Sequence, residues 1–263
     1  MVISKKYKYV FVEIPQTGCT AVSRELCENY AGKNILYKHA TYNEFLKIAT
    51  PEEQTYFVFA GVRNPLEIYV SQYFKYKTNH KGNFTNSSQL VSNGGFVTDI
   101  DLEKFRLIHD KGIDFCNYFQ RFVRSVYNNY YMLLNDKFDF IIRFESLTED
   151  FSKALDKIGI EPIRPLPHVN KTNKEGMEKP GFWSYYTPEI REQVVKTHGP
   201  FMKKWGYEFP EAWGQVSIPQ VSNLRFYSMD FLANGLAKYF SISPHSQHAS
   251  LHSLRNMLRK VWG

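Results

Sequence analysis

The sequence predicts an α/β fold: a doubly wound parallel sheet flanked by helices, with a helical extension at the C-terminus. Three segments rich in β-branched and aromatic residues have the pattern of buried strands: residues 9–14, 56–62 and 138–144. Each is followed within a few residues by a helix start signal. Alternating strands and helices of this kind are typical of a parallel sheet that is covered on both faces.

The helices are predicted from positions where a side chain can cap the first turn. Two of these signals pair a Ser or Thr with a Glu three residues later, which forms a capping box, and two others place a proline in the first turn. A short strand candidate, residues 35–38, lies between the first two helices, and the last helix is expected to end at residues 198–199. The signals are Thr20, Thr41 with Glu44, Asn64 with Pro65, Ser146 with Glu149, and Thr187 with Pro188.

The remaining segments set the domain organisation. Residues 77–100 are rich in Asn, Ser, Thr and Gly and form a loop too long for a simple connection, so we expect a lid, a substrate loop or a partly mobile segment. Helical patterns run through about residues 101–135, and residues 161–181 are irregular. Beyond these the composition shifts toward Ser, Asn and His, which divides the chain into a domain of residues 1–214 and a basic helical extension of residues 215–263.

The composition is that of a globular protein with a basic surface. Of 263 residues, 43% are hydrophobic and 22% are charged, which excludes collagen-like, low-complexity and disordered classes. Aromatic residues make up 16%, and their helical spacing places most of them in a core. The formal charge is +7, of which the extension, with five basic residues and one acidic, carries +4. We therefore expect an anionic partner and local, rather than general, positive potential on the domain.

The cysteine and hydropathy patterns favour a reducing, aqueous compartment. The three cysteines are an odd number without Cys-x-x-Cys spacing, which argues against a disulfide framework and against a zinc site. The apolar run after the basic N-terminus is too short for a signal sequence, and no stretch reaches the roughly 20 apolar residues of a membrane span. We therefore expect a cytoplasmic protein.

The loop between the first strand and the first helix is a candidate phosphate site, because unpaired backbone N–H groups and the helix dipole attract anions there. Its glycine allows close approach of the backbone, and its threonine hydroxyls can donate to oxyanions. An ATP-binding loop would need Gly-Lys-Ser/Thr here, which is not supplied, so a kinase is less favoured. For the loop alone, an ordinary tight turn is the less favoured alternative. Its candidate donor-binding residues are Pro15, Gln16, Thr17, Gly18, Cys19 and Thr20.

A second anion site is predicted at the end of the next long strand. Arg63 follows that strand and Ser71 lies eight residues later, so a guanidinium and a hydroxyl can converge on a second phosphate. Together the two sites resemble those of the sulfotransferases that use 3′-phosphoadenosine 5′-phosphosulfate (PAPS). That family binds the 5′-phosphosulfate with a Pro-Lys-Thr-Gly-x-Thr loop and the 3′-phosphate with an Arg and a Ser eight residues apart. The resemblance implies a P-loop-type fold and a reaction that needs no metal.

Further motifs are similar to the carbohydrate branch of that family, of the heparan 2-O-sulfotransferase type, and the resemblance covers about residues 7–208. These motifs are His39 and the segments 167–174, 185–189 and 205–207. The resemblance implies that His39 is the catalytic base, a role that suits an imidazole titrating near neutrality. Without the resemblance, His39 is better explained as a surface histidine before a helix cap.

The segment 167–174 holds the other candidate site residues. His168 is a competing base or a substrate contact, or it merely orders a proline-rich loop. Lys171, Thr172 and Lys174 are implied by the resemblance to close over the nucleotide, the alternative being a solvated basic loop.

Gln16 departs from the family pattern, since it stands where the family has a lysine. That lysine stabilises the leaving phosphate, whereas Gln carries no charge, and losing one transition-state contact of this kind costs about 10²–10³ in rate. Either a cation such as Lys38 or Lys171 compensates, or the chain is a slow or deliberately inactivated form. We expect Gln16→Lys to raise turnover without greatly changing donor binding; an unchanged or lower rate would place the lysine's role elsewhere.

The sequence thus predicts a sulfotransferase that moves a sulfonate group from PAPS to a hydroxyl of a glycan or glycoconjugate and releases adenosine 3′,5′-bisphosphate (PAP). Two alternatives stay open: a catalytically weak nucleotide-binding homologue, suggested by Gln16, and a P-loop small-molecule kinase. Nucleic acid is not an expected partner, because the basic residues are dispersed and no reader motif occurs. The tail has leucines at helical spacing from Leu251 to Leu258, so it either packs on the domain or lies on an anionic membrane surface.

Overall fold

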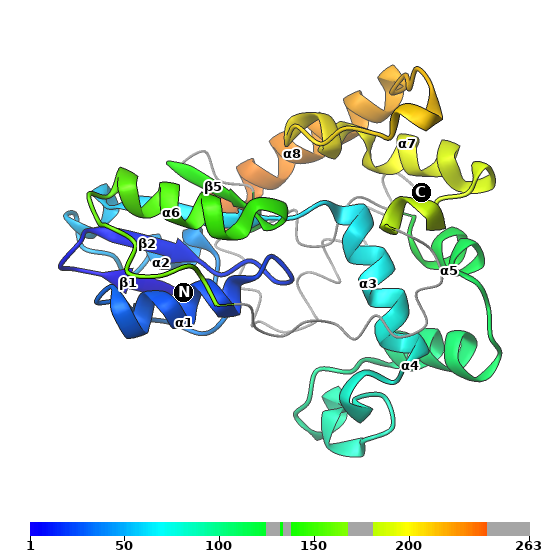
Figure 1. Ribbon diagram of the computed structural model, residues 1–263, viewed down its shortest axis with the longest axis horizontal. Coiled ribbons are helices and arrows are strands. Elements are labelled where there is room, and N and C mark those ends of the chain that lie inside the picture. The colour runs from blue at the N-terminus through cyan, green and yellow to red at the C-terminus, as the bar shows by residue number, and fades with distance from the viewer. Residues whose placement is uncertain (125–131, 134–137, 168–180, 241–263) are drawn as a thin grey trace. The chain divides into compact units, whose positions relative to one another are not determined.

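The computed structural model describes residues 1–124, 132–133, 138–167 and 181–240. The chain divides into two compact units, shown in Figure 1. Unit 1 comprises residues 1–62, 129–169 and 227 onward, and unit 2 comprises residues 63–128 and 170–226. Each unit has its own cluster of buried hydrophobic side chains.

Unit 1 is built on a five-stranded sheet with the order β3-β1-β2-β4-β5. Strands β2, β4 and β5 are parallel and correspond to the three predicted strands, so the predicted α/β fold class is confirmed. Strand β1 pairs antiparallel with β2 and with β3, which makes the sheet mixed rather than wholly parallel. The strands are β1 (Val2–Ser4), β2 (Tyr9–Val12), β3 (Lys33–Asn34), β4 (Phe57–Val62) and β5 (Phe140–Arg143).

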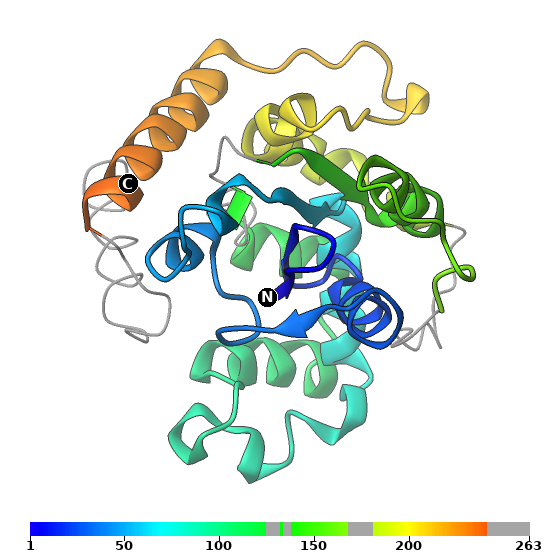
Figure 2. The same cartoon turned by 90° about the vertical axis from the view of Figure 1, so that its left-hand side faces the viewer.

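Among the described residues, three α-helices lie wholly within unit 1: α1 (Cys19–Asn29), α2 (Tyr42–Leu46) and α6 (Leu147–Lys157). Apolar side chains of α1 and α6 share one buried cluster with Tyr9, Phe11 and Phe59 of the strands. Because Tyr9 and Phe11 are two residues apart and Phe59 pairs with Phe11, these rings project from one face of the sheet. Helices α1 and α6 therefore cover that same face, as Figure 2 shows.

Unit 2 is helical and explains the high aromatic content. Its helices are α3 (Pro65–Lys77), α4 (Asp99–Phe105), α5 (Phe115–Phe122) and α7 (Pro188–Lys204), and α8 (Gln220–Phe240) begins in it. Their buried faces meet in a cluster of rings in which many pairs pack edge to face, a geometry that aromatic pairs prefer. Residues 77–100, expected to be an irregular loop, contain three short 3₁₀ turns, His80–Gly82, Ser87–Gln89 and Val91–Asn93.

Two of the predicted helix starts are confirmed in detail. The hydroxyl of Thr41 accepts from the Glu44 amide while the Glu44 carboxylate accepts from the Thr41 amide, which completes the capping box of α2. The Asn64 side chain accepts from the Leu66 amide at 3.0 Å, with Pro65 in the first turn of α3. Both signals involve contacts within four residues, which is why sequence alone found them.

Other predicted element ends are wrong because tertiary contacts override the local signal. The N-cap of α1 is Gly18, not Thr20. Ser146 is the N-cap residue of α6, as predicted, but its hydroxyl donates to the Asp150 carboxylate and the predicted capping box does not form. Helix α7 does not stop at residues 198–199 but runs through Pro200 to Lys204, because Gly199 packs against Ile218: a Cβ at residue 199 would lie 2.8 Å from that side chain. The expected strand at 35–38 is absent, and β3 lies just before it.

The predicted extension starts with α8, and its amphipathic pattern at residues 251–258 lies outside the described residues. Within the part of the chain that the structure describes, no helix is long and apolar enough to cross a membrane. The predicted boundary between residues 214 and 215 stays a prediction.

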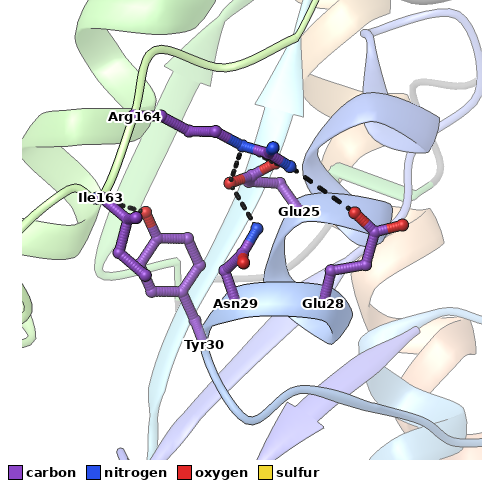
Figure 3. Close-up of polar contacts among 6 residues, drawn as sticks. All are labelled: Glu25, Glu28, Asn29, Tyr30, Ile163 and Arg164. Atoms are coloured by element: carbon purple, nitrogen blue, oxygen red, sulfur yellow. Dashed lines mark hydrogen bonds and ion pairs between the residues drawn. The ribbon is translucent and has the colours of Figure 1, made fainter.

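An ion pair between a buried carboxylate and a half-exposed arginine fastens the C-terminal half of α1 to the segment after α6 (Figure 3). Arg164 donates from Nε and Nη2 to the Glu25 carboxylate at 2.8–3.3 Å, and Glu25 is only 1% exposed. Asn29 donates to the same carboxylate at 2.7 Å. One residue away, the amide of Ile163 donates to the Tyr30 hydroxyl at 2.9 Å. The hydrogen bonds from Arg164 and Asn29 satisfy the Glu25 carboxylate, which would otherwise be buried without a partner.

Arg164→Ala is expected to lower the Tm clearly, because it leaves the Glu25 carboxylate buried without its cation. Arg164→Lys should recover part of the loss, since an ammonium restores the charge but not the forked geometry. Thermal unfolding followed by circular dichroism measures the Tm of each variant. Glu28→Gln is the matched control, because Glu28 is more than half exposed and lies 3.6 Å from Arg164; equal Tm values for all three variants would contradict the role of the pair.

Candidate functional site

The loop after β2 turns tightly and is closed by its own threonine. The Thr17 hydroxyl donates to the Ile14 carbonyl at 2.8 Å, and Thr17 is 1% exposed. Gln16 and Gly18 have left-handed backbone conformations, with φ of 67° and 78°. A left-handed conformation is uncommon for a residue with a side chain, and Gln16 is held there by the loop around it. The hydrogen bond donated by the Thr17 hydroxyl therefore stabilises the turn.

Two glycines let the loop fit between neighbouring elements of unit 1. A Cβ at Gly18 would lie 2.7 Å from the Leu147 side chain at the start of α6. A Cβ at Gly61, in β4, would lie 2.6 Å from the Thr17 hydroxyl. Both distances are shorter than real Cβ contacts. A Cβ at residue 61 would displace Thr17 and with it the loop, whereas at residue 18 the left-handed φ of 78° disfavours a side chain more than the contact with Leu147 does. The predicted role of Gly18 thus has a geometric basis, and Gly61 is a residue that the sequence analysis missed.

The loop leads to a helix N-terminus that no side chain caps. Helix α1 begins with Gly18 as N-cap, without a side-chain hydrogen bond, and no acidic residue lies in its first turn. Its first amides and the positive end of the helix dipole are therefore unopposed, as an anion site requires. Thr20 lies in this first turn and is half-buried. Pro15 and Gln16 are also half-buried.

Cys19, the first residue of α1, is not suited to be a nucleophile. Its side chain is 5% exposed and belongs to the buried cluster of unit 1. Burial raises the pKa of the Cys19 thiol to about 11, so the thiol stays protonated at neutral pH. Its contribution to an anion site is restricted to the backbone amide.

His39 is held in the tautomer that a general base needs. Its Nδ1 lies 2.7 Å from the Glu13 carbonyl, which can only accept, so Nδ1 carries the proton and the neutral ring keeps its lone pair on Nε2. Burial lowers the pKa of His39, and the neighbouring Lys38 ammonium lowers it further, against the opposing effect of the hydrogen bond to Glu13. The ring is therefore neutral at pH 7. Its backbone, with φ of 69°, is left-handed like that of Gln16.

Lys38 places a positive charge beside the loop. Its Nζ donates to Thr20 Oγ1 at 2.9 Å. Lys38 and Thr20 also line an open pocket of unit 1, about 430 Å³ in volume, together with Ser23, Arg24 and Asn34. The pocket therefore begins at the helix N-terminus and offers several hydrogen-bonding side chains to a polar ligand.

The second predicted site lies at the start of unit 2. Arg63 directly follows β4 and forms a paired contact with Glu67, Nε to Oε2 at 3.1 Å and Nη2 to Oε1 at 3.0 Å. Glu67, Ser71 and Lys75 recur every four residues and so lie on one face of α3. Within unit 1, β2 and β4 are parallel neighbours, so both strands end at the same edge of the sheet.

Lys75 belongs to this face and was missed by the sequence analysis. Burial lowers the pKa of Lys75, and the charges of Arg63 and Lys81 lower it further, so three cations lie within electrostatic reach of one another. No acceptor among the described residues contacts the Lys75 ammonium. Repelling cations of this kind are stabilised by an anion. The four-residue spacing after Ser71 is the signal that would have revealed it.

The remaining predicted residues, His168, Lys171, Thr172 and Lys174, lie outside the described residues. In the described ranges, no group of three or more His, Cys, Asp or Glu side chains could hold a metal ion.

Residues 1–198 match the sequence model of the Sulfotransferase family. The match covers most of the 263-residue chain and includes the loop, His39, Arg63 and the predicted site face of α3. It ends within α7, so α8 lies beyond it. No curated protein and no solved structure matches the chain significantly.

Gly61→Ala is expected to weaken PAP binding at least about tenfold, because the new methyl group displaces Thr17 and with it the loop. Calorimetric titration with PAP measures the effect. Gly112→Ala is the control for a general glycine effect, since nothing lies within 4 Å of a Cβ there, although φ of 66° makes it the more strained replacement. If Gly61→Ala binds PAP as tightly as the parent chain, the loop does not bind the nucleotide.

Proposed function

The chain belongs to the sulfotransferase family, and on that premise we propose that it transfers a sulfonate group from PAPS to a hydroxyl of a glycan or glycoconjugate. The observation that carries the proposal is the pairing, in unit 1, of an uncapped helix N-terminus with a neutral histidine whose Nε2 is kept basic. An anion site and a general base are the two groups that transfer to a hydroxyl requires.

The loop is proposed to bind the 5′-phosphosulfate of the donor. Its amides, the first turn of α1 and the Thr20 hydroxyl supply donors for the sulfonate and phosphate oxygens. Gly18 lets the backbone approach these oxygens without a side chain between them. Thr17 contributes indirectly, by holding the turn in which the amides converge.

His39 is proposed to be the general base. Its Nε2 takes the proton of the acceptor hydroxyl while the oxygen forms a bond to sulfur, and the bond from sulfur to the phosphate oxygen breaks. The electron pair of that bond leaves with PAP. The Glu13 carbonyl holds the ring and stabilises the imidazolium once it forms.

Arg63, Ser71 and Lys75 are proposed to bind the 3′-phosphate. Glu67 fixes the guanidinium of Arg63 from one side, and Lys75 adds a second, partly buried cation on the same helix. Such a site distinguishes PAPS from ATP, which has no 3′-phosphate. Lys171, Thr172 and Lys174 are proposed to contribute to the same nucleotide site.

A glycan acceptor is supported by the resemblance to the carbohydrate branch and by the hydrogen-bonding side chains among those that line the pocket beside Thr20. Polyhydroxylated ligands are recognised by hydrogen-bonding side chains such as Ser23, Arg24 and Asn34. His168 is proposed to contact the acceptor. The main alternative, a nucleotide-binding homologue without activity, is favoured only by the uncharged Gln16.

The proposed function predicts that the chain binds PAP at least about tenfold more tightly than ATP, and that it transfers labelled sulfonate from PAPS to a hydroxylated acceptor. Calorimetry measures the affinities for PAP and ATP, and an assay with a panel of glycans measures the transfer of sulfonate. Lys75→Gln should reduce the preference for PAP, whereas the exposed neighbour Lys77→Gln should leave it unchanged. Tighter binding of ATP would overturn the sulfotransferase function, and PAP binding without any transfer would favour the inactive homologue.

The acid limb of kcat/KM is expected below pH 6.5, because the pKa of His39 is lowered and the base is lost only when the ring is protonated. His39→Asn should reduce transfer by about 10²–10⁴ and retain PAP affinity. Asn keeps a donor toward the Glu13 carbonyl and tolerates the left-handed backbone. A pH profile unchanged by His39→Asn would assign the base to another residue.

A further inference from the structure

We propose that Lys38 supplies the positive charge for the leaving phosphate that Gln16 lacks, by reaching the donor site across the Thr20 hydroxyl. The inference deepens the proposed function, on which it rests. Breaking the bond from sulfur to the phosphate oxygen leaves additional negative charge on that oxygen, and a nearby cation lowers the barrier. Gln16 offers only a neutral hydrogen bond at the position where the family has its lysine.

The Lys38 ammonium lies at the end of the loop where α1 begins. Its Nζ lies 2.9 Å from Thr20 Oγ1, and Thr20 is in the uncapped first turn of α1. A group bound to that turn and to the Thr20 hydroxyl would lie within a few ångströms of the ammonium. An ammonium has three N–H donors, of which Thr20 engages one, so the others remain suited to phosphate oxygens.

The backbone that carries Lys38 is fixed rather than loosely exposed. Lys38 lies in a turn closed by the bond from the Ala40 amide to the Tyr37 carbonyl at 3.2 Å. His39 next to it is bound to the Glu13 carbonyl, and Ala40 is fully buried. The Tyr37 hydroxyl donates to the Glu44 carboxylate of α2. The same turn therefore presents the proposed base and the proposed cation on adjacent residues.

The charge of Lys38 is felt by groups on both sides of the loop. It lowers the pKa of His39 and opposes the rise in the pKa of the Cys19 thiol that burial causes. Both effects require the ammonium to lie close to the start of α1. The open pocket that Lys38 lines with Thr20 and Arg24 gives a ligand access to the ammonium.

The test uses four full-length proteins: the parent chain, Lys38→Gln, Gln16→Lys and the double variant. Lys33→Gln is the matched control, because Lys33 is also an exposed lysine of unit 1. Transfer rates are measured with PAPS, and affinities are measured by calorimetry for PAP and for adenosine 3′-monophosphate. The second nucleotide lacks the 5′-phosphate, so Lys38 should not affect its binding.

We expect Lys38→Gln to reduce transfer about 10²-fold and PAP affinity about tenfold, with adenosine 3′-monophosphate affinity unchanged. Gln16→Lys should restore transfer in the Lys38→Gln background and change the parent rate little, which replaces the expectation from sequence that it raises turnover by itself. Transfer and PAP affinity equal to those of Lys33→Gln would overturn the role of Lys38. So would a Gln16→Lys effect of equal size in both backgrounds. A parent chain that neither binds PAP nor transfers sulfonate would instead overturn the proposed function itself, and this inference with it.

Discussion

The hydrogen bond from the Thr17 hydroxyl to the Ile14 carbonyl is the interaction on which the proposed site of unit 1 depends. It closes a turn that is too tight for side chains at two positions, one within the loop and one on β4. With the chain turned in this way, α1 begins at Cys19, its N-cap glycine offers no side chain, and the first amides are left for an external acceptor. The proposed anion site therefore depends on the absence of a side-chain cap at this helix N-terminus.

In the proposed mechanism, two adjacent residues of the turn at residues 37–40 have separate roles: Lys38 supplies positive charge and His39 accepts the proton. Lys38 keeps its ammonium on the Thr20 hydroxyl, while His39 is held neutral by burial and by that same ammonium. A cation so close would impair a general acid, which must be protonated at rest. It suits a general base, which must stay unprotonated until the acceptor binds. If these roles hold, Lys38 and His39 together supply the charge and the base, although Gln16 is uncharged at the position where the family has a lysine.

The parts of the fold that sequence predicted are those decided within a few residues. The parallel strands were found because each is a continuous apolar run, and the capping box of Thr41 and Glu44 because its partners are three residues apart. The three-residue strand β1 was missed, since its existence depends on pairing with β2 and β3. Within the site, the tautomer of His39 depends on a carbonyl 26 residues away in the chain. Gly61 was missed for the same reason, because only the packed sheet brings it against Thr17.

Helix α1 is fixed at both ends, by the tight turn before it and by the segment around Arg164. At its N-terminus the tight turn sets the position of the amides that are proposed to bind the anion. Toward its C-terminus Glu25 binds Arg164, and Tyr30 accepts from Ile163, as Figure 3 shows. Arg164 precedes His168 by four residues and Lys171 by seven. A buried carboxylate with a forked partner holds its geometry more firmly than an exposed pair would. The segment that begins after Arg164 is therefore fastened at its start to the helix whose N-terminus is proposed to bind the phosphosulfate.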